Sequence, residues 1–144
     1  MKLTAGSSSF QLTILGYQFP DAEGEQYDAN WLIVRVDVES PRGSWTATDP
    51  CLLTYEAAQL AEWIEKVAQG EPVQPGMKFL EPALLFRLTN EGNLRIYFSS
   101  FLRPEWAQEG EAPFLEFPVS QVDLAAAARD LRVQIRRYPQ RAER

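Results

Sequence analysis

The sequence of 144 residues contains no histidine and only one cysteine, Cys51. Histidine is the side chain used most often for acid–base catalysis near neutral pH and for binding transition metals. Its absence excludes Ser-His-Asp triads, Cys-His dyads and ordinary His-containing zinc sites. A single cysteine forms neither an internal disulfide nor a thiolate cluster, which favours a reducing, cytoplasmic compartment. We therefore expect no bound metal and no cofactor.

A long apolar run is also missing. Residues 1–10, MKLTAGSSSF, have no apolar block before the serines, and no later window approaches the length of a membrane span. We expect a protein that is neither exported nor inserted in a membrane. The length suits one domain with a core of its own, which we place at residues 1–144 with the core from about residue 10 to residue 138.

Positive charge is scarce, and most of the excess negative charge lies in the body of the chain. The net charge is −6, but residues 129–144 carry six arginines against Asp130 and Glu143, so the other 128 residues carry −10. An acidic body repels phosphate backbones and attracts basic partners. We therefore expect a protein partner and no nucleic acid. The arginines at 129, 132 and 136 have helical spacing and indicate a solvated helix face.

Alternating apolar and polar residues predict six strands, at about residues 10–15, 31–39, 43–48, 84–88, 94–98 and 114–117. Pro82 is expected to open the fourth strand, where a missing backbone donor costs nothing. The acid before it, Glu81, is expected to pair with Arg87 or Arg95 at the rim of the sheet.

Two helices are expected, from about Thr54 to Gln69 and from the SQVD segment to the residue before Pro139. Thr54 and Ser120 are the expected caps, with Asp123 completing a capping box. The order βββα-βββα predicts an α+β fold with one antiparallel sheet of about six strands and both helices on one face.

Cys51 is the strongest indication of an enzyme, because it precedes the first helix and a helix N-terminus lowers a thiol pKa. Without histidine there is no base to activate it, and its leucine neighbours favour a buried packing residue. The acids between residues 21 and 28 match no EF-hand spacing, so a calcium site is not expected. We do not expect an enzyme.

Two acidic segments carry aromatic side chains, and they are the candidate binding surface. Tryptophan or tyrosine surrounded by carboxylates is suited to anchor a basic partner, although packing over the end of the sheet is an alternative role for Trp106. The candidate partner-binding residues are Asp21, Glu23, Glu25, Tyr27, Asp28, Glu105, Trp106, Glu109 and Glu111.

Five stretches, in this order and spacing, resemble WapI-type immunity proteins: NWLIVRVDVES, GSWTATDPCLLTYEAAQLAEWIEKV, FLEPALLFRL, LRIYFSSFLRPEW and LEFPVSQVDLAAAARDL. The resemblance covers about residues 10–138. It implies a bacterial protein that neutralises a contact-delivered, wall-associated toxin, in that family a nuclease acting on transfer RNA. The alternative is a non-enzymatic adaptor or scaffold protein with another basic partner; a thiol-dependent enzyme is the third hypothesis.

Overall fold

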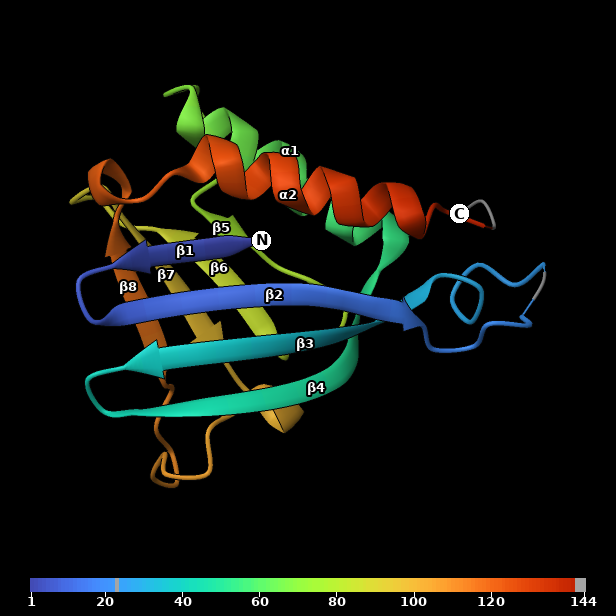
Figure 1. Ribbon diagram of the computed structural model, residues 1–144, viewed down its shortest axis with the longest axis horizontal. Helices are drawn as coiled ribbons and strands as arrows, with labels where there is room; N and C mark the ends of the chain where they lie inside the picture. Colours follow the sequence, from blue (N-terminus) through green and yellow to red (C-terminus); the bar gives the residue numbers. More distant parts are fainter. Residues whose placement is uncertain (23, 142–144) are drawn as a thin grey trace.

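The computed structural model describes residues 1–22 and 24–141. Within these residues the chain forms two four-stranded antiparallel sheets and two α-helices in the order ββββα-ββββα (Figure 1). Two short 3₁₀ helices, η1 (Ser100–Leu102) and η2 (Val119–Gln121), interrupt the second half.

Sheet A is a meander of long strands. Its members, in spatial order, are β1 (Lys2–Ala5), β2 (Ser8–Tyr17), β3 (Trp31–Ser40) and β4 (Gly43–Leu53). The register of β3 on β4 shifts between Leu32 and Val34. The bulge is on β4, where Pro50 and Cys51 lie opposite the single residue Ile33. Pro50 has no backbone donor, and bulges are one of the few places where a strand tolerates proline.

Sheet B is a meander of shorter strands. Its members are β5 (Gly76–Met77), β6 (Leu84–Leu88), β7 (Asn93–Phe98) and β8 (Phe114–Pro118). Alternate residues of these strands are buried, including Phe86, Ile96 and Phe117. The residues between them, among them Leu85 and Tyr97, form the opposite face.

The two sheets bury their apolar faces against each other. Phe10 of sheet A meets Phe86 and Phe98 of sheet B with ring centroids 6.1 and 5.9 Å apart. Trp45 of β4 contacts the Phe98 ring edge-on at 5.0 Å. Aromatic contacts of this kind join the two meanders into a single core.

Helices α1 (Thr54–Ala68) and α2 (Leu124–Arg137) pack against each other along the β1 edge of the sandwich (Figure 1). Arg132 of α2 donates two hydrogen bonds to the Glu65 carboxylate of α1, at 2.8 and 3.2 Å. This contact lowers the pKa of Glu65. The exposed arginines 129 and 136 lie on the solvated face, as the spacing predicts.

The prediction of one six-stranded sheet is wrong, although the α+β class is confirmed. A period-two pattern indicates which side of a strand is buried, but it does not indicate whether a helix or a second sheet covers that side. The missing strands, β1 and β5, have four and two residues, too few for a clear period.

The helix starts also differ from the prediction. Leu53 is the N-cap of α1, and the Thr54 hydroxyl donates to the side-chain oxygen of Asn30 instead of capping. Asp123, and not Ser120, caps α2, because its carboxylate accepts from the Ala126 amide at 2.9 Å. The observed cap is one residue before the predicted one in α1 and three residues after it in α2, since the exact cap depends on where the preceding segment leaves the sheet.

Candidate partner-binding surface

The two acidic segments lie at opposite ends of sheet A. Acidic loop 1, residues 18–30, joins β2 to β3, whereas acidic loop 2, residues 103–113, follows η1 and reaches the β3–β4 turn through the contact of Arg42 with Glu111 (Figure 1). The ten residues of β3 run between the two ends. At about 3.3 Å per residue the separation is roughly 30 Å, so the loops do not form one compact patch.

Acidic loop 1 is anchored by Asn30, which is completely buried. Its side-chain nitrogen donates to the carbonyl of Gln26 at 2.7 Å, and its side-chain oxygen accepts from the Thr54 hydroxyl at 2.8 Å. The Thr54 amide in turn donates to the Asn30 carbonyl at 2.9 Å. One buried amide therefore fixes the end of the loop to the first turn of α1.

Arg141, three residues beyond Tyr138 at the C-cap of α2, holds the other part of acidic loop 1. Its guanidinium donates to the main-chain carbonyls of Phe19, Pro20 and Ala29 at 2.6–2.7 Å. The same group stacks over the Tyr17 ring at 3.8 Å. Sequence reasoning assigned no role to Asn30 or Arg141. The carbonyls that Arg141 contacts are more than a hundred residues away and leave no sequence signal.

These contacts use the backbone of acidic loop 1 and leave its side chains outside. Asp21, Glu25, Tyr27 and Asp28 are all exposed, and the Tyr27 side chain is 43% exposed. Phe19 adds a second exposed aromatic ring. The Glu25 carboxylate accepts from the Asp28 amide, which shapes the turn. Glu23 lies outside the described residues. At its described positions acidic loop 1 therefore presents carboxylates and aromatic rings, with its backbone held at Phe19, Pro20 and Ala29.

Acidic loop 2 uses its aromatic residue internally. The Trp106 ring meets Trp45 edge-on at 5.5 Å and lies under the Arg42 guanidinium at 4.5 Å. Its indole nitrogen is buried and, among the described residues, has no hydrogen-bond partner. A Cβ on Gly43 would lie 2.9 Å from that nitrogen. Trp106 is thus half-buried over the end of sheet A.

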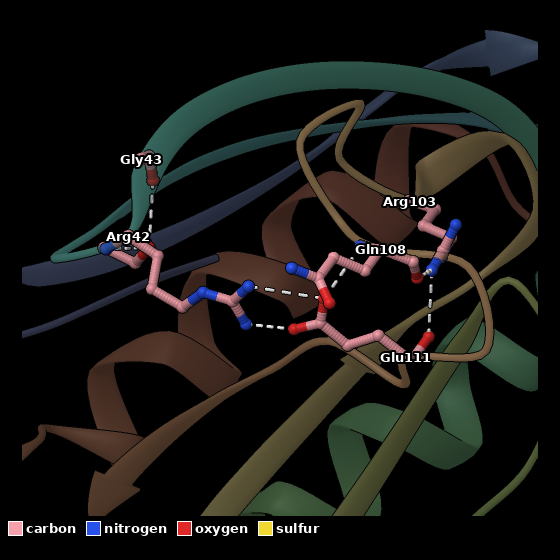
Figure 2. Close-up of polar contacts among 6 residues, drawn as sticks. Arg42, Gly43, Arg103, Gln108 and Glu111 are labelled. Atoms are coloured by element: carbon pink, nitrogen blue, oxygen red, sulfur yellow. Dashed lines mark hydrogen bonds and ion pairs between the residues drawn. The ribbon is translucent and has the colours of Figure 1, made fainter.

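Glu111 is also engaged within the fold. Figure 2 shows its carboxylate facing the Arg42 guanidinium, while Arg103 donates to the main-chain carbonyls of Gln108 and Glu111. The Gln108 amide donates to the same carboxylate at 2.9 Å. The hydrogen bond from Arg42, followed by that from Gln108, lowers the pKa of Glu111. Only Glu105 and Glu109 remain exposed acids on this loop.

Cys51 lies in β4, not at a helix N-terminus, and is 1% exposed. Burial, with a smaller effect of nearby Asp49, raises the pKa of its thiol. This is the opposite of what activates a nucleophile. The prediction that Cys51 packs in the core is confirmed, since it belongs to the main apolar cluster.

The other acids form no metal site in the described part of the chain. Burial and then the charge of Glu81 raise the pKa of Asp49. Arg95 pairs with Glu116, and among the described residues no ion pair joins Glu81 to Arg87 or to Arg95, so the predicted pairing of Glu81 is wrong. Glu81 instead lies in a loop before β6, near another carboxylate, and Pro82 precedes the strand by two residues.

A family model described as the immunity protein WapI-like family matches residues 2–139, nearly the whole chain. Neither the curated proteins nor the solved structures contain a significant match. In the described residues, no helix has the length and apolar character needed to cross a membrane.

Proposed function

The chain belongs to the immunity protein WapI-like family, and on this basis we propose that it binds a cognate, contact-delivered toxin domain and neutralises it by covering a basic surface. Toxin neutralisation is the general function that the family indicates, and proteins of such families are generally not enzymes. The finer proposal is that the toxin domain is a nuclease, which must present basic side chains to hold RNA.

The observation that supports this proposal best is the construction of acidic loop 1. Its backbone is held by Asn30 and Arg141, while Asp21, Glu25 and Asp28 remain exposed beside Tyr27. A surface that is fixed before binding loses little conformational entropy when the partner arrives. Carboxylates accelerate encounter with a basic partner, and an aromatic ring supplies contact area.

Both acidic loops belong to the proposed binding surface, but they contribute differently to binding. Acidic loop 1 is the main contact, through Asp21, Glu23, Glu25, Tyr27 and Asp28. Acidic loop 2 adds long-range attraction through Glu105 and Glu109, while Trp106 and Glu111 contribute by holding that loop in place. The net charge of −6 favours approach of a basic domain as a whole.

The experiment compares two matched charge-neutralised variants of the full chain against the cognate toxin domain. The first carries Asp21→Asn, Glu25→Gln and Asp28→Asn; the second carries Glu105→Gln and Glu109→Gln. We expect the first to slow association by about tenfold at low salt, and the second by about twofold, because rim charges act mainly on the association rate.

Tyr27→Ala tests the aromatic contact in the same assay. It should increase the dissociation rate by about tenfold and leave the association rate nearly unchanged. Unchanged rates in all three variants, with wild-type protein still bound, would show that the toxin domain binds another face. Failure of the wild-type chain to bind or protect would overturn the proposed function itself.

A further inference from the structure

A cavity of about 420 Å³ lies at the end of sheet B, between the segment before β6 and the segment after β7. Its lining includes the apolar side chains of Phe79, Pro82, Leu85 and Tyr97. Lys78 and Arg103 line it as well. Its size suits an aromatic or a large aliphatic group, and its lining combines apolar surface with two cations and the carboxylate of Glu111.

The walls of the cavity are fixed by hydrogen bonds that involve its backbone. The buried Glu56 carboxylate accepts from the Leu53 amide at 3.0 Å and from the Leu80 amide at 2.7 Å, which ties the segment before β6 to α1. The Ser99 amide donates to the Ala83 carbonyl at 3.0 Å, and the Ser99 hydroxyl donates to that of Pro82. The cavity is therefore formed before any ligand binds.

Exposed apolar side chains occur on the same segments. Leu80 is 63% exposed and Phe101 is 78% exposed, and Phe114 packs against Tyr97 with ring centroids 5.1 Å apart while remaining exposed itself. Ser100, next to Phe101, has a φ of 52°, in the left-handed region that residues other than glycine rarely adopt. A small molecule inside the cavity would leave this apolar surface in water, whereas a protein segment would cover it.

The cavity is lined by two cations, Lys78 and Arg103, and by one acid, Glu111; Arg103 and Glu111 belong to acidic loop 2. Lys78 forms no ion pair within the described residues. The Arg103 guanidinium donates hydrogen bonds to two main-chain carbonyls, and the Glu111 carboxylate pairs with Arg42. Lys78 is therefore the cation at the cavity that remains available to a ligand, and a cation beside an apolar cavity favours a ligand that carries negative charge next to an apolar group.

We propose that this cavity is an anchor site for an aromatic side chain flanked by acidic residues on the toxin domain. The ring lies over Leu85 and Tyr97, which are paired across β6 and β7, and a neighbouring carboxylate approaches Lys78. The inference rests on the proposed function for the identity of the partner. The chemistry of the ligand is argued from the cavity alone. The acidic, aromatic segment that would bind here is distinct from the basic surface of the toxin domain that acidic loop 1 is proposed to bind.

The first experiment uses short peptides as probes and needs no toxin. Acetyl-Asp-Trp-Asp-amide is titrated into the ¹⁵N-labelled full chain, with acetyl-Lys-Trp-Lys-amide and acetyl-Asp-Ser-Asp-amide as matched controls. We expect amide shifts at Leu85, Tyr97, Ser99 and Arg103 with the first peptide only. Absence of these shifts at millimolar peptide, or equal shifts with the basic peptide, would overturn the proposed ligand chemistry.

Variants then test the two elements of the site. Leu85→Glu places a charge in the cavity and should weaken peptide binding at least about tenfold, whereas Leu15→Glu, an exposed leucine of sheet A, should not. Lys78→Glu should shift the preference toward the basic peptide. Spectra of each variant establish that the fold is retained. Equal affinity of Leu85→Glu and wild type would place the peptide elsewhere.

The second experiment separates this inference from the proposed function. In the complex with the toxin domain, Leu85→Glu should raise the dissociation rate about tenfold. A complex that depends on acidic loop 1 but is unaffected by Leu85→Glu would overturn the anchor site and leave the proposed function standing. Dimerisation of the free chain that Leu85→Glu abolishes would assign the cavity to a second copy and overturn the proposal.

Discussion

Acidic loop 1 and acidic loop 2 have similar compositions and opposite uses. In acidic loop 1 the backbone is held by hydrogen bonds from Asn30 and Arg141, and the described acids and Tyr27 are exposed to solvent. In acidic loop 2 it is side chains that contact the rest of the fold, since Trp106 packs on Trp45 and Glu111 pairs with Arg42. Composition therefore does not distinguish a surface kept available for a partner from one used to close the fold.

The difference follows from what each loop meets at its end of sheet A. Acidic loop 1 meets donors at its end of sheet A: the Thr54 amide and hydroxyl of α1 and the Arg141 guanidinium, which satisfy main-chain carbonyls of the loop and the Asn30 side chain. Acidic loop 2 meets the β3–β4 turn, where Arg42 offers a charge and Gly43 leaves room for an indole ring. Substitutions in the two loops should therefore separate stability from binding.

The largest effect is expected at Asn30. Asn30→Ala should lower the free energy of unfolding by about 3 kcal/mol, because it leaves the Thr54 hydroxyl and the Gln26 carbonyl without this partner in a buried place. Urea denaturation measures the loss. The control Asp28→Ala, at an exposed position, should change stability by less than about 0.5 kcal/mol. A loss at Asn30 no larger than this control would mean that acidic loop 1 is not anchored there.

Trp106 and Tyr27 provide the direct comparison. Trp106→Ala should cost about 2 kcal/mol of stability, less than for a fully buried tryptophan, because Trp106 is only partly buried. Tyr27→Ala should cost under about 0.5 kcal/mol. Trp106→Phe should recover most of the loss, since it keeps a ring against Trp45 and removes a buried donor without a partner. Thermal unfolding of the three variants shows whether Trp106 stabilises the fold and whether Tyr27 does not.

Gly43 tests how closely the β3–β4 turn and acidic loop 2 fit. Gly43→Ala should lower stability by about 2 kcal/mol, because its φ of 152° is unfavourable for other residues and the new methyl group meets the Trp106 ring. Gly110→Ala in acidic loop 2 has the positive φ but no neighbour within 4 Å, so it should cost only about 1 kcal/mol. In a Trp106→Ala background the two costs should become equal.

The smallest effect is expected at the ion pair of Arg42 with Glu111. Because the pKa of Glu111 is lowered in the folded protein, the pair stabilises the fold above the ordinary pKa of about 4.5. This contribution is lost as the pH falls from that value through the lowered one. Glu111→Gln should therefore reduce Tm slightly at neutral pH and remove this part of the acid dependence. Glu109→Gln, at an exposed carboxylate, should do neither, and added salt should weaken the effect in wild type.

Much of this molecule was predictable from short-range patterns. The strand positions from Phe10 to Phe117, the extent of α1, the burial of Cys51 and the exposed character of acidic loop 1 follow from periodicity and composition. The absence of histidine is likewise read directly from the sequence. These features depend on a few neighbouring residues or on the number of residues of one type, so they can be read without knowing which distant segments come into contact.

Pairings across the fold were decided only by the tertiary structure. The division into two sheets, the hold of Arg141 on acidic loop 1, the packing of Trp106 on Trp45 and the cavity beside Leu85 all join segments that are distant in sequence. From the sequence, an apolar face, a charge or an aromatic ring indicates that a contact is needed, but it does not indicate which residue makes that contact. The partner is set by which segments the sandwich brings together, because packing and hydrogen bonding act at contact distance.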